Sequence, residues 1–173
     1  MDKEVEHAAA GLKAAFDDVL EALRVACESH YGARLVSLVV FGSVGRGTMR
    51  PDSDIDVLVV ADPLPDGRMS RVRDFAPVEE ALEPMLQAKR PMELATSLSP
   101  IFKTPGEMAA GSPLLLDMTE DARVLYDRDC FFQRQITEFG ARLKRLGARR
   151  FFVGNAWWWD LKPDFRPGDT VTL

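Results

Sequence analysis

Two aspartates one residue apart stand directly before an apolar run. Asp54 and Asp56 flank Ile55 and lead into VLVVA, so the sequence predicts a buried strand over 55–61. Side chains at i and i+2 of a strand point to the same face, and the two Cα atoms lie about 6.6 Å apart at strand rise. Carboxylates this close repel each other, and the pair therefore favours a bound cation such as Mg²⁺.

A glycine-serine pair, Gly42-Ser43, follows the apolar run LVSLVVF, which predicts an earlier buried strand over 35–41. Gly42 lets the backbone approach a ligand closely. Ser43 is expected to cap a short helix, whose free amide groups and positive dipole end suit phosphate. Arg46 would add charge to this phosphate site, and Gly47 would keep the turn open. Taken alone, a glycine-rich segment of this kind more often only connects two strands.

The combined pattern is more specific than either half. It reads Gly42-Ser43, ten intervening residues, and Asp54-x-Asp56 at the head of an apolar strand. It resembles the nucleotidyltransferase superfamily that includes DNA polymerase β, and the spacer is similar to that of the minimal nucleotidyltransferases of prokaryotes. The resemblance implies an α/β (α+β) fold, with a mixed β-sheet flanked by helices. It also implies two Mg²⁺ ions at the aspartates and a nucleoside triphosphate at Gly42, Ser43, Arg46 and Gly47.

The resemblance further implies a third carboxylate on a later strand, for which Glu93 is the candidate. Alternation in MELATSL predicts a strand over 92–98, with Glu93 on a face of small residues. There it would complete the metal site or accept the proton of the acceptor hydroxyl in catalysis. An ordinary surface glutamate is the alternative at this position. Glu107 and Asp117 are rival candidates for the third carboxylate.

Other segments carry the periodicities of the elements that must position this site. The sequence predicts helices over 4–29, 69–88, 105–121 and 130–147, and a short strand over 122–127. Pro77 and Pro84 argue against an uninterrupted second helix. The order of elements predicts one mixed sheet with helices packed on it, in a nucleotidyltransferase domain over 1–150.

The segment 151–173 forms a separate tail, marked by consecutive tryptophans and by prolines. Pro163 and Pro167 exclude one long helix. Trp157–Trp159 cannot all face one core in an extended chain. Two interpretations stay open: the tail packs on its own domain, or it contacts a partner subunit or a second copy, since tryptophan is enriched at interfaces. Such tails resemble those of nucleotidyltransferases that pair with a small helical HEPN protein.

Composition and charge exclude several classes of protein. The 173 residues carry a net charge of −5, and the sequence pI is about 5.1. This balance argues against DNA or RNA as the main partner, and the basic residues 144–150 are interpreted as a solvated helix end. Two cysteines make no disulfide framework. The sequence has no apolar signal region and no run near the about 20 residues that cross a bilayer, so we expect a cytoplasmic protein.

The expected reaction is transfer of a nucleotidyl group, AMP from ATP, to a hydroxyl, with release of pyrophosphate. Two acceptors fit the resemblance. One is a side chain of a cognate HEPN toxin, which would make this chain an antitoxin, and the other is a small molecule of the aminoglycoside type. A non-enzymatic antitoxin or binding module, acting by contact alone, is a further alternative. The intact Ser43, Asp54 and Asp56 favour the enzyme.

Overall fold

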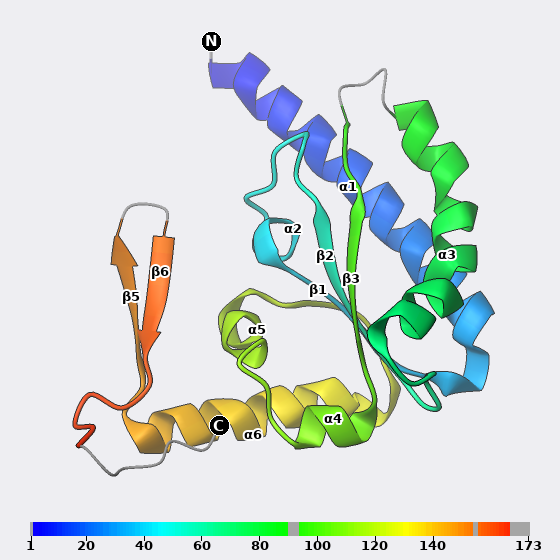
Figure 1. The fold of residues 1–173 in the computed structure, drawn as a ribbon. Coiled ribbons are helices and arrows are strands. Elements are labelled where there is room, and N and C mark those ends of the chain that lie inside the picture. Colours follow the sequence, from blue (N-terminus) through cyan, green and yellow to red (C-terminus); the bar gives the residue numbers. More distant parts are fainter. Residues whose placement is uncertain (1, 90–93, 154–155, 167–173) are drawn as a thin grey trace.

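A mixed four-stranded sheet forms the centre of the computed structural model, which describes residues 2–89, 94–153 and 156–166 (Figure 1). Strand β2 pairs antiparallel with β1 and parallel with β3, and β1 pairs antiparallel with β4. The strand order is β3-β2-β1-β4, with bounds β1 Leu35–Phe41, β2 Ile55–Ala61, β3 Leu98–Lys103 and β4 Arg123–Asp127. The predicted α+β class, one mixed sheet flanked by helices, is confirmed.

Helices pack on both faces of the sheet, and the alternation along β2 divides the core into two clusters. Ile55 and Val57 lie in the cluster with α1 and α3, whereas Leu58 and Val60 lie in the cluster with α4, α5 and α6. The helices are α1 Asp2–Tyr31, α2 Gly42–Arg46, α3 Arg68–Lys89, α4 Pro105–Ala109, α5 Leu115–Asp121 and α6 Phe131–Leu146, with short 3-10 helices η1 Gly32–Arg34 and η3 Arg128–Cys130. Asp56 therefore projects on the α5 side of the sheet.

Two predicted elements differ from the structure. The third strand begins at Leu98, and residues 94–97 of the predicted strand lie outside it, because β2 offers its first pairing residue, Ile55, opposite Leu98. The predicted helix over 105–121 is divided into α4 and α5, because Gly111 adopts a φ of +82° that ends the first of them. Helix α3 continues through its two internal prolines, and three of its side chains are buried in the first cluster: Phe75, Val78 and Leu82.

The tail forms a hairpin of β5 (Arg149–Val153) and β6 (Ala156–Asp160), which stands beside α5 and α6 in Figure 1. Arg150 lies opposite Trp159, and Phe151 lies opposite Trp158. Trp159 packs against the second core cluster, whereas Trp158 is 51% exposed and stacks on Phe151 with ring centroids 5.8 Å apart. Part of the tail thus packs on its own domain, and a partner contact through Trp158 stays a prediction. The predicted domain boundary at 150/151 falls within β5, and the division itself stays a prediction.

Strand β3 forms one edge of the sheet, and two features modify that edge. Pro100 lies in the middle of β3 and has no amide hydrogen. The carbonyl oxygen of Phe102 accepts a hydrogen bond from Arg71 Nη1 of α3, over 3.3 Å. The edge of β3 therefore lacks a hydrogen-bond donor at Pro100, and its acceptor at Phe102 is already in use.

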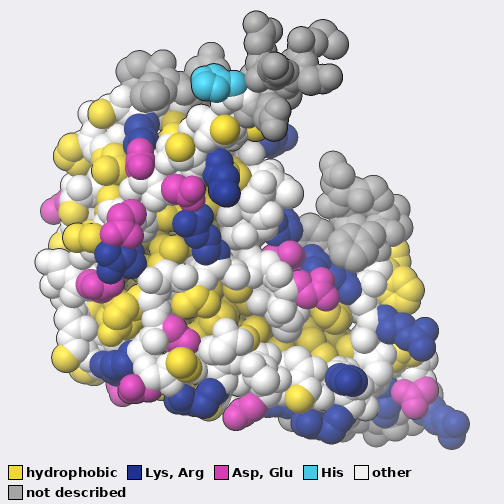
Figure 2. All heavy atoms as spheres, turned by 180° about the vertical axis from the view of Figure 1, so that it is seen from behind, with side chains coloured by type: hydrophobic (Ala, Val, Ile, Leu, Met, Phe, Trp, Pro, Cys, Tyr) yellow, Lys and Arg dark blue, Asp and Glu magenta, His cyan; other side chains and the backbone are white. Residues whose placement is uncertain are grey.

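The surface seen in Figure 2 mixes basic and acidic side chains over the whole described area of that face, without a continuous basic patch. Within the residues that the structure describes, no helix combines the length and the apolar character needed to cross a membrane.

Candidate active site

The candidate site lies at the end of the sheet where β1 ends and β2 begins. Gly42 turns the chain out of β1 into α2 with a φ of +66°, which residues with a side chain rarely adopt. Asp56 lies opposite Phe41 in the β1–β2 register. A Cβ added to Gly42 would collide with the Asp56 carboxylate and would lie 3.2 Å from its Cγ. Glycine is thus required at this position for the carboxylate to lie against the start of α2.

Two serines of the β3 segment hold the two aspartates. Ser97 Oγ donates a hydrogen bond of 2.6 Å to Asp54 Oδ1. Ser99 lies opposite Asp56 in the parallel β2–β3 register and bonds its carboxylate. Burial raises the pKa of Asp56, the Ser99 hydrogen bond lowers it, and the charge of Asp54 raises it again. The residue numbers of the serines repeat the i, i+2 spacing of the aspartates, a signal that sequence reasoning did not use.

The pair of carboxylates fits a hard divalent cation, which prefers oxygen ligands. The raised pKa of Asp56 reflects burial and the neighbouring charge of Asp54, and a bound cation would oppose both effects. Among the described residues, no group of three or more His, Cys, Asp or Glu side chains is placed to hold a metal ion. Glu93, the predicted third ligand, lies outside the described residues.

Ser43 does not have the capping position that its sequence suggested. The N-cap of α2 is Phe41, which provides no side-chain hydrogen bond, and Ser43 is the second residue of the helix. Its carbonyl oxygen accepts the amide of Thr48 over 2.9 Å. Gly47 ends α2 in the left-handed conformation, with a φ of +72°. The two residues therefore shape the turn, with Ser43 at its start and Gly47 at its end.

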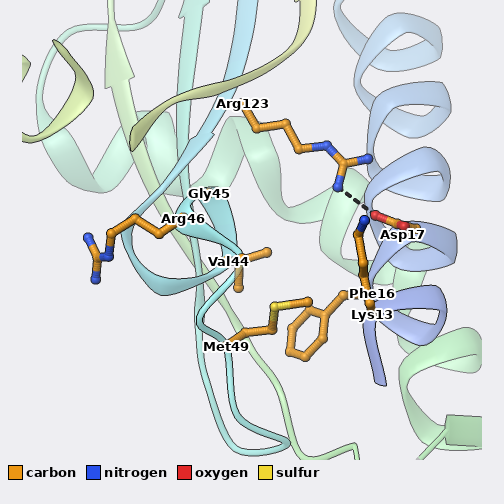
Figure 3. Close-up of a pocket in the computed structure, with 9 residues that line it drawn as sticks. Lys13, Phe16, Asp17, Val44, Gly45, Arg46, Met49 and Arg123 are labelled. Atoms are coloured by element: carbon orange, nitrogen blue, oxygen red, sulfur yellow. Dashed lines mark hydrogen bonds and ion pairs between the residues drawn. The ribbon is translucent and has the colours of Figure 1, made fainter. Parts of the chain in front are cut away.

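The side chain of Arg46, the last residue of α2, lies near Asp121 and acts on Asp56 through its charge. A pocket of about 320 Å³ lies between α1 and α2, and Arg46 is one of the residues that line it. Figure 3 shows Lys13 and Arg123 on one side, with the Arg46 guanidinium extending away from them. Arg46 Nη1 lies 3.7 Å from Asp121 Oδ2, and the positive charge of Arg46 lowers the pKa of Asp56. The role predicted for Arg46, positive charge at the phosphate site, stays a prediction.

One rival third carboxylate, Glu107, lies elsewhere in the fold. Glu107 forms a capping box with Thr104 at the start of α4, after the far end of β3, and Arg71 Nη1 binds it over 2.8 Å. This ion pair and its place in the fold rule out Glu107 as a partner of Asp54. Asp117 lies in the first turn of α5.

Two residues outside the motif connect to the candidate site. Asp121, at the end of α5, contacts Arg46, and Arg150 of β5 binds Asp121 with its side chain only 7% exposed. The interpretation of residues 144–150 as a solvated helix end is therefore wrong for Arg150.

Comparison with known proteins agrees with the motif. Residues 20–97 match the model of the nucleotidyltransferase domain. A protein of Methanocaldococcus jannaschii, named "Putative protein adenylyltransferase MJ1305", is 28% identical over 132 residues, which are 75% of this chain and 84% of the relative.

Two solved structures are also similar to this chain. One is described as "Crystal structure the toxin-antitoxin MntA-HepT", with 14% identity, a TM-score of 0.44, and coverage of 75% of this chain and 92% of that chain. The other is described as "Crystal structure of the toxin-antitoxin with AMP-PNP", with 16% identity, a TM-score of 0.43, and coverage of 73% and 92%. The segment matched by the domain model contains the whole motif from Gly42 to Asp56, and this match supports the predicted nucleotidyltransferase enzyme.

Proposed function

We propose that this enzyme transfers AMP from ATP to a hydroxyl group of a partner protein, with Mg²⁺ held by Asp54 and Asp56. The observation that carries the proposal is the contact of the Asp56 carboxylate with Gly42, which brings the paired acids to the start of α2. The name of the archaeal relative supports AMP as the group transferred and a protein as the acceptor. ATP is a cytoplasmic metabolite, and the proposal places the enzyme in the cytoplasm.

The partner in this proposal is a small helical toxin of the HEPN type, and the chain acts as its antitoxin by modifying it. This part of the proposal is supported by the resemblance of the motif and its spacer to the minimal nucleotidyltransferases. The exposed Trp158 and the Phe151 ring stacked on it offer an aromatic contact surface for that partner.

The reaction forms one bond and breaks one. The acceptor oxygen attacks the α-phosphorus, the bond to the bridging oxygen breaks, and pyrophosphate leaves with its electron pair. Glu93 is the proposed base for the hydroxyl proton. Bound Mg²⁺ would neutralise part of the negative charge of the phosphates. The chain itself holds the triphosphate at Ser43 and the α2 turn.

The test is transfer of labelled α-phosphate from ATP to a co-expressed partner in the presence of Mg²⁺. We expect labelling by the wild-type chain and none by Asp54→Asn or Asp56→Asn, with unchanged thermal unfolding. Asp52→Asn is a matched control, because Asp52 lies in the same loop and its side chain is 67% exposed beside Arg50. Full labelling by both Asp54→Asn and Asp56→Asn would refute the assignment of the metal site.

A small cationic acceptor of the aminoglycoside type is the second candidate, and one observation favours it. A pocket of about 330 Å³ adjoins Ser97, the partner of Asp54, and Glu79 and Glu83 of α3 line it. The two carboxylates would attract a cationic molecule into this pocket. In the same assay, label in an added aminoglycoside and not in any protein would select this acceptor. Inhibition of a partner without label in any fraction would instead favour an antitoxin that acts by contact.

A further inference from the structure

The carboxylate of Asp121 lies between two arginines that come from distant parts of the chain. Asp121 Oδ2 is 3.0 Å from Arg150 Nη2 of β5 and 3.7 Å from Arg46 Nη1 of α2. Arg150 Nη1 also donates to Glu120 Oε2 over 2.8 Å. The side chains of Arg150 and Asp121 are 7% and 17% exposed, so their ion pair is shielded from water. Asp121 therefore has a fixed partner in Arg150 while it contacts Arg46.

The backbone brings α2 against the end of α5 at the same place. A Cβ added to Gly45 would collide with the carbonyl oxygen of Asp121 and would lie 2.9 Å from that of Val40. The two elements thus approach more closely than any side chain at residue 45 would allow. Arg46, the next residue, leaves α2 directly beside Asp121.

Arg46 can contact Asp121 and a phosphate at the same time. Its guanidinium carries five N–H donors in a planar fork, more than the contact with Asp121 alone can use. The Arg46 side chain is 23% exposed, and its guanidinium extends away from Lys13 and Arg123 in Figure 3. The direction in which the Arg46 guanidinium points therefore depends on its contact with Asp121.

We propose that Asp121 is a positioning residue for nucleotide binding: it holds Arg46 at the triphosphate site, and Arg150 of the hairpin holds Asp121. The inference rests on the proposed function, because it takes Mg²⁺-ATP to bind at the α2 turn. It gives strand β5 a part in the nucleotide site that the glycine-serine and aspartate motif does not contain.

The test is a double-mutant cycle on Mg²⁺-ATP binding, measured by calorimetry. We expect Asp121→Asn to raise the Kd about five- to tenfold, the range of a coupling between charged neighbours. Arg46→Met should raise it at least as much, and the double variant should bind no more weakly than Arg46→Met alone. Glu120→Gln is the matched control, because Glu120 binds the same Arg150 through its other nitrogen, Nη1, and the Kd of this variant should equal that of the wild type.

Three outcomes would overturn the inference: an unchanged Kd for Asp121→Asn, additive losses in the double variant, or an equal loss in Glu120→Gln. A purely structural role of Asp121 would lower the unfolding temperature without this pattern in Kd. If Asp121→Asn does not fold, Arg46→Lys provides the test, since one ammonium group lacks the fork that reaches both carboxylate and phosphate. Wild-type affinity in Arg46→Lys would refute the inference, whereas a wild-type chain that does not bind Mg²⁺-ATP would refute the proposed function.

Discussion

Replacing Gly42 by alanine tests whether the Asp56 carboxylate must lie against the first residue of α2. The substitution introduces two separate effects. Alanine must adopt the left-handed φ of +66°, and its Cβ must displace the Asp56 carboxylate, with which it collides. The first effect acts on stability, and the second acts on the position of a proposed metal ligand.

The two effects have different magnitudes. A residue with a side chain in the left-handed region costs about 1–2 kcal/mol, which lowers the unfolding temperature by about 2–8 °C in a chain of this length. A displacement of a catalytic group by about 1 Å lowers the rate by about 100-fold. We therefore expect Gly42→Ala to lose nearly all transfer activity while most of the molecules remain folded.

Gly32→Ala separates the two effects. Gly32 also has a positive φ, +52°, but an added Cβ there meets no atom within 4 Å. We expect a similar loss of stability and full activity, with unfolding followed by circular dichroism and transfer by labelled ATP. Full activity in Gly42→Ala would refute the reasoning, as would an equal loss of activity in both variants.

Three further predictions concern other parts of the molecule. Ser43→Ala should weaken Mg²⁺-ATP binding in calorimetry, and an unchanged affinity would mean that the turn only connects two strands. Trp158→Ala should lower association with a partner or a second copy in light scattering and leave Mg²⁺-ATP binding intact; an unfolded variant would place Trp158 in the core. The Arg71 hydrogen bond lowers the pKa of Glu107. The pair therefore stabilises the fold above the usual glutamate pKa of about 4.3, and this stabilisation is lost as the pH falls through the lowered pKa. Glu107→Gln should cost at most about 1 kcal/mol in urea unfolding at pH 7, since the pair is partly exposed, and a cost that persists in strong acid would contradict this account.

Continuous apolar runs made the two central strands predictable to the residue. The first run, 35–41, ends before Gly42, and the second run, 55–61, begins after Asp54. The structure has β1 and β2 at these bounds. The predicted third strand begins too early: MELATSL alternates like a strand, but residues 94–97 lie outside β3 in the structure. The segment LSPIFK, which forms β3, contains Pro100, and a proline does not suggest a strand.

The proximity of Gly42, Asp54 and Asp56 was predictable, because all three belong to the single motif that connects the end of β1 to the start of β2. The contacts of Asp121 were not predictable, since its partners Arg46 and Arg150 come from separate segments of the sequence. Contacts of this kind depend on how α5 and the hairpin pack on the sheet, and they leave no periodic pattern in the sequence.

The edge formed by β3 has a consequence for how copies of this protein meet in concentrated solution. A strand from another molecule extends a sheet by pairing with a row of free amides and carbonyls. Pro100 provides no amide, and the Phe102 carbonyl is already bonded to Arg71. Edge-to-edge aggregation is therefore disfavoured at these two residues of β3. Any self-association of the enzyme on this side must use side chains, which a point substitution can change without altering the sheet.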